Sequence, residues 1–186
     1  MSPDTSAEPA PSAVNLFTSG DVAAILRERG WIDQSCDADA EAALAVWCTC
    51  AADLLGPHAA DRAALTELLA LVFGYEAAAL LQNTANQAVL AREGAREVMR
   101  ELANRVLDGG DVDSDRFKEI IDGMKAALPH RGRSLFFPIR LALAGRAGEG
   151  ELDRVILLLD AAARIGFAVP VKGTRQRMLE FCAALD

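Results

Sequence analysis

Basic side chains are the residues of this sequence that could do the most definite chemistry. Ten candidates lie within or beside one strongly apolar stretch and at the ends of expected helices: Lys125, His130, Arg131, Arg133, Arg140, Arg146, Arg164, Lys172, Arg175 and Arg177. Ammonium and guanidinium groups bind phosphate, and a guanidinium also stacks on an unpaired base. These ten residues are therefore candidates for contacting RNA.

Charge is distributed unevenly around these candidates. The formal net charge of the chain is -8, which by itself disfavours binding to nucleic acid. Residues 116–186 nevertheless hold 12 basic and 8 acidic side chains, whereas residues 1–115 hold 7 and 19. Such a local field can steer a charged ligand, although ordinary solvated surface charge explains the same distribution. No aromatic stacking surface is expected beside the cations, because Phe136, Phe137 and Phe181 are assigned to the core.

The sequence offers little for catalysis or metal binding. Both histidines, His58 and His130, stand next to prolines in expected loops and outside any nucleophile or zinc motif. The aspartates at positions 111, 113 and 115 fit a loop and a helix cap. The cysteines lack the spacing of a disulfide framework or metal site and are expected to be reduced: Cys36, Cys48, Cys50 and Cys182. We therefore expect no catalytic residue, no cofactor and no bound metal.

One strongly apolar helix, expected over residues 134–145, must position the basic loop that precedes it. Ser134 is the predicted N-cap, and Pro138 is placed in or just past the first turn, where a missing N–H costs little. Gly145 supplies the left-handed stop. Apolar side chains cover most of this helix, so we expect it to be central. Arg140 is the exception, because its guanidinium must reach solvent, pair with a carboxylate or face a ligand.

The rest of the chain shows the period of amphipathic helices and no alternating strand pattern. We expect an all-α bundle of about eight to ten helices, as one domain or as two packed lobes. The expected parts are a disordered arm over residues 1–18, an acidic helical lobe over 19–110 and a mildly basic helical lobe over 111–186. There is no apolar run of about 18 residues and no secretory leader, so we expect a cytoplasmic protein without a membrane partner.

A family resemblance rests on three parts of the sequence. Residues 135–145 (LFFPIRLALAG) with residues 148–152 (GEGEL) resemble a signature of glutamyl-tRNA synthetases, in their C-terminal, all-α, anticodon-binding region. Residues 117–125 (FKEIIDGMK) and the loop at 131–133 (RGR) resemble the segment before that signature. Residues 61–68 (DRAALTEL) resemble an earlier helix of the family. Ala144 replaces the family's threonine, the second glycine is not followed by proline, and no nucleotide-binding motif is present.

The resemblance implies a non-catalytic tRNA-binding module that lacks the catalytic half of a synthetase. Arg131 and Arg133 are then expected to approach phosphates of the anticodon arm, and the candidate surface is expected to continue to Lys172 and Arg175. Arg140 matches the arginine of the signature and either contacts RNA or locks helices together. The alternative is a protein-interaction or regulatory scaffold that keeps the fold without binding RNA. An acidic or apolar surface around the loop at Arg131 is the observation expected from that alternative.

Overall fold

The computed structural model describes residues 15–32 and 38–185. Both ranges are helical and contain no strand, which confirms the expected all-α class. The elements are α1 (Ser19–Glu28), α2 (Ala38–Leu55), a short 3-10 helix η1 (Gly56–His58), α3 (Arg62–Phe73), α4 (Ala77–Gln82), α5 (Thr84–Leu90), α6 (Ala95–Leu107), α7 (Ser114–Ala127), α8 (Arg133–Ala144), α9 (Glu151–Ala163) and α10 (Thr174–Leu185). These ten α-helices lie within the expected number.

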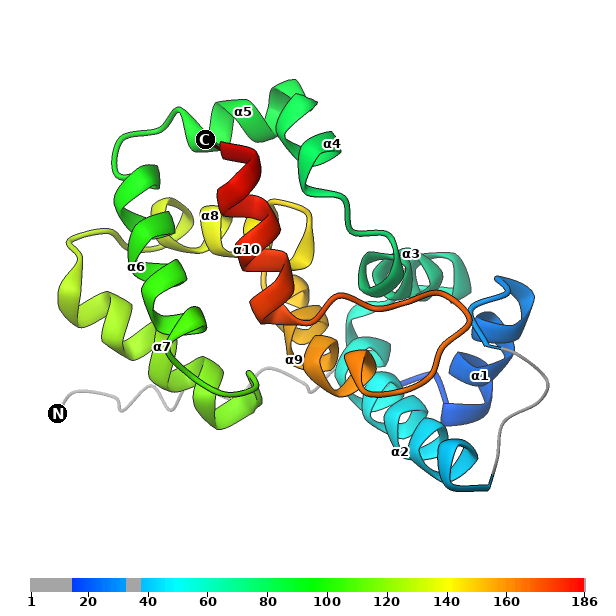
Figure 1. Cartoon of the computed structure of the whole chain (residues 1–186). Coiled ribbons are helices and arrows are strands. Elements are labelled where there is room, and N and C mark those ends of the chain that lie inside the picture. The colour runs from blue at the N-terminus through cyan, green and yellow to red at the C-terminus, as the bar shows by residue number, and fades with distance from the viewer. Residues whose placement is uncertain (1–14, 33–37, 186) are drawn as a thin grey trace, which may run out of the picture.

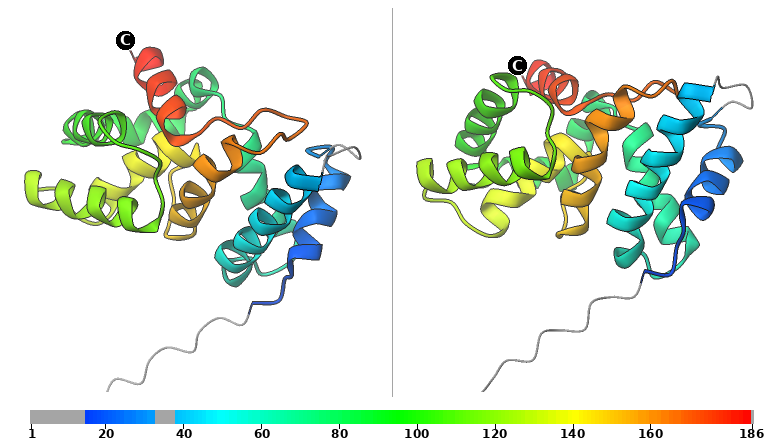
Figure 2. Two further views of the ribbon diagram at one scale, coloured as in Figure 1. Left: turned by 60° about the horizontal axis from the view of Figure 1, so that its bottom comes forward. Right: turned by 90° about the horizontal axis from the view of Figure 1, so that it is seen from below.

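Helices α8 and α9 form the centre of the molecule, as Figure 1 shows. Helix α8 packs against α5, α6, α9 and α10, whereas α9 also packs against α2 and α3. Figure 2 shows α1, α2 and α3 gathered at one end, with α6 and α7 at the other. The apolar residues of α9 recur at helical spacing, so one face of α9 is buried along its length. The expectation of a central apolar helix over residues 134–145 is confirmed.

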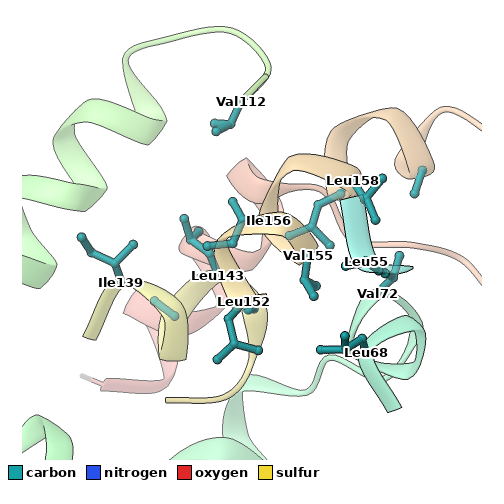
Figure 3. Close-up of a cluster of buried hydrophobic side chains, with 14 of the residues drawn as sticks. Leu55, Leu68, Val72, Val112, Ile139, Leu143, Leu152, Val155, Ile156 and Leu158 are labelled. Atoms are coloured by element: carbon teal, nitrogen blue, oxygen red, sulfur yellow. The ribbon is translucent and has the colours of Figure 1, made fainter. Parts of the chain in front are cut away.

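The buried side chains of both expected lobes form one continuous hydrophobic cluster. Figure 3 shows its middle, where Leu143 of α8 and Val155 of α9 lie in the same cluster as Leu55 of α2 and Val72 of α3. Burying one such side chain contributes about 1.5–3 kcal/mol. Packing across α8 and α9 therefore connects the acidic and the basic parts of the chain.

The start of α8 differs from the expectation. Helix α8 begins at Arg133 after Gly132, whose φ of 55° is one that glycine tolerates best. Ser134 is thus not the N-cap, and its hydroxyl donates to the carbonyl of Arg131 at 2.7 Å. Pro138 lies in the second turn, where its missing N–H removes the bond to the carbonyl of Ser134. The expected stop is confirmed, since Gly145 has a φ of 80°.

Helices α1, α3, α5 and α7 begin after residues whose side chains cap them, whereas α4, α6 and α9 have no side-chain cap. Thr18 caps α1 in a reciprocal capping box with Asp21, and Asp113 caps α7 by accepting from the N–H of Arg116. Thr174 at the start of α10 has a hydroxyl of the kind that caps helices. Instead its hydroxyl and its N–H both donate to the Asp160 carboxylate at 2.7 Å. A long-range partner therefore replaces the local cap.

Most of the expected arm and one cysteine, Cys36, fall on residues that lie outside the described ranges. Just before α1, the Asn15 side chain donates to the carbonyl of Ala52 at 2.9 Å. Among the described helices, none combines the length and the apolar character needed to cross a membrane.

Candidate nucleic-acid interface

The loop between α7 and α8 is built around Arg131. Its guanidinium donates to the carbonyls of Lys125, Leu128 and His130, each at 2.6 Å. Lys125 lies in the last turn of α7 and Leu128 is its C-cap, so the cation binds carbonyls that the helix leaves without a partner. Arg131 remains exposed at the surface while it holds the loop in place.

Arg133 lies next to an aromatic ring at the surface. Its side chain is 72% exposed and its guanidinium lies 5.7 Å from the centre of the Phe137 ring. Arg92, from the segment before α6, lies 5.8 Å from the same ring. The ring of Phe137 is only half-buried, so it presents part of its surface between two cations. Glu149 is 3.1 Å from Arg133, in an ion pair exposed enough to contribute little.

Phe136 makes a second contact of this kind. Lys125 lies 6.0 Å from the centre of its ring and Arg140 lies 4.8 Å away. The assignment of Phe136 and Phe137 to the core is therefore only partly correct, since both rings pack against the core and remain partly exposed. Consecutive helix positions point about 100° apart, so a helix buried through Leu135 and Ile139 leaves intermediate positions at its edge.

We call this region the α8 start surface. It comprises the cations and rings that surround the first turns of α8: Arg92, Lys125, Arg131, Arg133, Phe136 and Phe137. His130 lies beneath it, with Nε2 at 3.1 Å from Glu97 Oε2 and a side chain that is 17% exposed. His130 also fills the space beside Gly94, whose φ of 81° suits glycine. His130 thus ties the loop to α6.

Arg140 does not face a ligand. Its Nε and Nη2 donate to the two carboxylate oxygens of Asp153 at 2.7 and 2.8 Å, and Nη1 donates to the carbonyl of Gly148 at 2.7 Å. Only 7% of Arg140 is exposed. Of the alternatives open from the sequence, the structure selects the ion pair, because α9 brings Asp153 against this face of α8. Arg140 is therefore removed from the RNA-contact candidates.

Arg177 is fully buried, so it is not available to RNA either. Its guanidinium donates to four carbonyls at 2.6–3.0 Å, those of Leu71, Val72, Leu143 and Lys172. The first three belong to the last turns of α3 and α8, where carbonyls lack helical partners. Burial lowers the pKa of Arg177 to about 10, so the group stays charged at neutral pH.

Tyr75 completes the cluster around Arg177. Its ring lies 4.5 Å from the guanidinium, and its hydroxyl donates to the carbonyl of Ala142 at 2.6 Å. Burial raises the pKa of the Tyr75 phenol above its usual value. One feature of the sequence indicated that Arg177 is buried. Thr174, Arg177, Met178 and Phe181 share the i, i+3, i+4, i+7 face of α10, so Arg177 lies on the buried side.

The other candidates lie apart from the α8 start surface. Lys172 pairs with Glu180 at 2.7 Å and lies 3.8 Å from Glu76. The loop that contains Lys172 runs towards α1 and α2, away from the start of α8 (Figures 1 and 2). Arg175 donates to the carbonyl of Leu107 at the end of α6. The expected continuous surface from Arg131 to Lys172 and Arg175 is therefore not formed, and Lys172 lies among carboxylates.

The last two candidates follow α8 and α9. Arg164 pairs with the carboxylate of Asp111. Arg146 is exposed directly after α8 and has no hydrogen-bond or ion-pair partner among residues 15–32 and 38–185. Arg146 therefore remains available to a ligand, on the side of α8 opposite to its start.

Within the described part of the chain, no three side chains of the His, Cys, Asp or Glu type come together as metal ligands. Burial raises the pKa of the Cys48 thiol to about 11, and burial also raises that of Cys50. Both thiols are therefore protonated at neutral pH and weak nucleophiles.

Parts of the chain are similar to two curated glutamate–tRNA ligases. Glutamate–tRNA ligase 2 of Syntrophus aciditrophicus is 31% identical over 72 residues, which are 39% of this chain and 15% of that ligase. Glutamate–tRNA ligase of Heliobacterium modesticaldum is 27% identical over 97 residues, 52% of this chain and 19% of that ligase. No protein-family model and no solved structure matches the chain. The expected relationship to a region of these ligases is supported, and the chain spans less than one fifth of either.

Sequence reasoning missed three members of the α8 start surface, namely Arg92, Phe136 and Phe137. Arg92 lies 41 positions before Arg133 in the chain, and only the packing of α6 against α8 brings the two together. Helical spacing did not distinguish the two rings from the core, because the consecutive positions 138–144 of the same helix are all buried.

Proposed function

We propose that this chain is a tRNA-binding module without catalytic activity of its own. The observation that carries the proposal is the α8 start surface, where half-exposed rings alternate with cations. The similarity to glutamate–tRNA ligases supports RNA as the ligand class. The resemblance of residues 135–152 to the signature of the anticodon-binding region supports the anticodon arm as the part of tRNA that binds.

Each component of the surface suits a different part of an RNA loop. Arg92 and Arg133 flank the Phe137 ring, so a base stacked on the ring would place its phosphates near both guanidinium groups. Stacking on an aromatic side chain contributes about 1–3 kcal/mol per base. Arg131 uses one side of its guanidinium on the carbonyls of α7 and is exposed on the other. The fixed loop therefore presents cations without the entropy cost of ordering them on binding.

Retention of labelled total tRNA on a filter tests the proposal. With about four phosphate contacts, affinity should fall roughly a hundredfold between about 50 and 200 mM salt. Arg92→Ala with Arg133→Ala should lower the slope of log affinity against log salt by about two. Phe137→Leu keeps an apolar side chain but removes the ring, and it should weaken binding about tenfold with little change in salt dependence.

The matched control is Arg27→Ala with Arg29→Ala, which removes the same charge from the exposed end of α1. This control should leave affinity within about twofold, because these residues lie far from α8. A chain that retains no tRNA at the lower salt concentration would refute the proposal. Equal losses in the control and in the Arg92 and Arg133 variant would show that only total charge matters.

A protein-interaction or regulatory scaffold is the second candidate function. The observation that favours it is the environment of Lys172, which lies between Glu76 and Glu180. The net charge of -8 points in the same direction. Recovery of a protein partner through a surface other than the α8 start surface, with no bound RNA, would select this role.

A further inference from the structure

A groove of about 670 Å³ opens between α5, α6 and the C-terminal end of α10. Figure 1 shows the end of α10 lying between α5 and α6. Its apolar lining comes from four helices and the segment between α5 and α6, and includes Leu81, Leu90, Ala95, Met99, Ala184 and Leu185. Ala95 and Met99 form a buried floor, whereas 45% of Leu185 is exposed at the rim. The groove is within the size range of ligand pockets.

Two arginines of α6 lie at the groove. Arg96 lines it, and Arg100 follows one helical turn later on the same exposed side of α6. Neither guanidinium has a hydrogen-bond or ion-pair partner within the described ranges. The carboxylates of α6 are used elsewhere, since Glu97 contacts His130 and Glu101 pairs with Arg105. Among the described residues, no carboxylate lines the groove.

We infer that this groove binds an acidic amphipathic helix of a partner protein. Apolar residues of such a helix at i, i+3 or i+4, and i+7 would fill the groove over Met99 and beside Leu185. Carboxylates spaced one turn apart would meet Arg96 and Arg100, which have the same spacing on α6. The apolar lining is aliphatic and offers no ring for a base to stack on, so it suits a protein rather than RNA.

This inference goes beyond tRNA binding and does not depend on it. The two surfaces share no residue, because the groove is lined by Arg96 but by neither Arg92 nor Arg133, although Arg92 and Arg96 both border a smaller pocket. One chain could therefore hold a tRNA and a protein at the same time. The module would then bring a bound tRNA to another protein.

Selection from a displayed library of helical peptides of about 15 residues, roughly four turns, tests the inference. Peptides selected on the full chain should carry net negative charge and apolar residues at the stated spacing. A labelled peptide of that kind should lose at least about tenfold in affinity for Arg96→Glu with Arg100→Glu, since like charges then face each other. Arg27→Glu with Arg29→Glu makes the same charge change on α1 and should alter affinity less than about twofold.

A second variant tests the groove itself. Ala184→Trp places a large side chain at an exposed position of the lining and should also weaken the peptide at least about tenfold. Circular dichroism should show unchanged helix content, and tRNA retention should match that of the unaltered chain. The inference is overturned if selected peptides lack the acidic amphipathic pattern, if none is enriched, or if both groove variants bind as tightly as the original chain. Loss of tRNA binding alone would overturn the proposed function and leave this inference standing.

Discussion

The two ends of α8 are built in opposite ways. At the C-terminal end, the carbonyls of Ala142 and Leu143 accept from Tyr75 and Arg177, and all four residues are buried. At the N-terminal end, Gly132 offers no side chain as a cap and Arg133 is 72% exposed. One end is closed by fixed internal donors, whereas the other leaves cations and rings at the surface.

The contrast shows how one helix can serve both stability and binding. Carbonyls buried without a partner cost free energy, so the C-terminal end needs donors that do not move. The N-terminal end faces solvent, where water can satisfy the free N–H groups. Arg177 at the closed end is therefore structural, whereas Arg133 at the open end is available to a ligand. The following variants test where that division lies.

The largest effect is expected from Arg177→Met. It removes a buried cation and leaves four carbonyls at the ends of α3 and α8 without their donor. We expect a loss of roughly 3–5 kcal/mol in the free energy of unfolding, as when one member of a buried charged network is removed. Urea unfolding followed by circular dichroism measures it. Arg175→Met, two positions earlier and exposed, is the control and should cost far less.

Arg140→Met tests whether Arg140, in the middle of α8, stabilises the fold or binds RNA. Removing the guanidinium leaves Asp153 without its two-point partner, and we expect a cost of about 2–3 kcal/mol. Adding Asp153→Asn should recover part of that loss, because no unpaired carboxylate then remains. Binding of tRNA should not change in either variant. If a variant lost much of its tRNA affinity while its stability stayed normal, Arg140 would belong with the ligand-binding residues at the N-terminal end of α8.

Tyr75→Phe should have a smaller effect, about 1 kcal/mol at neutral pH, through the lost bond to Ala142. Tyr75 is the only tyrosine of the chain, so ultraviolet absorbance reports its ionisation directly. Burial raises its pKa, so above about pH 10 the unfolded chain ionises while the folded chain does not, and stability falls as pH rises. Tyr75→Phe should lack this part of the fall. If the folded chain instead showed tyrosinate absorbance from about pH 10, Tyr75 would be accessible to solvent and the C-terminal end of α8 would not be closed.

The smallest expected effect is a difference in stability between variants of two neighbouring arginines, Arg131 and Arg133. Arg131→Ala should cost about 0.5–1 kcal/mol, because its guanidinium holds carbonyls at the end of α7. Arg133→Ala should change stability by less than about 0.5 kcal/mol, since its ion pair is exposed. Thermal unfolding measures the difference, and tRNA retention should fall in both variants. Equal stability of the two would indicate that the Arg131 contacts are not maintained in solution.

Local structure was predictable where a short stretch of sequence decides it. Asn83 caps α5, and Gly94 with its φ of 81° precedes α6, because each residue sets the backbone at one position. Asp113 caps α7 for the same reason. Thr174 shows the limit of local rules. Its hydroxyl could cap α10, but the carboxylate of Asp160 lies close enough in the fold to accept it instead.

The candidate site was predictable in part. The basic loop at Arg131 and Arg133 lies at the surface as expected for a ligand-binding loop. The sequence could not show that Arg177 and Arg140 are internal donors, because a charge is equally compatible with solvent, a carboxylate or a carbonyl. The choice depends on groups more than ten positions away, such as Asp153 for Arg140 and Val72 for Arg177.

Sequence alone determined that this protein is helical, that Gly145 ends an apolar helix, and that this helix, which contains Arg140, lies at its centre. These properties follow from periodicity and from the backbone preferences of single residues, so they need no knowledge of neighbours in space. The tertiary structure decided which arginines are buried, that Arg92 meets Phe137, and that an apolar groove remains beside α6. Those outcomes depend on packing between helices, which sets the partners that each charge and each ring can reach.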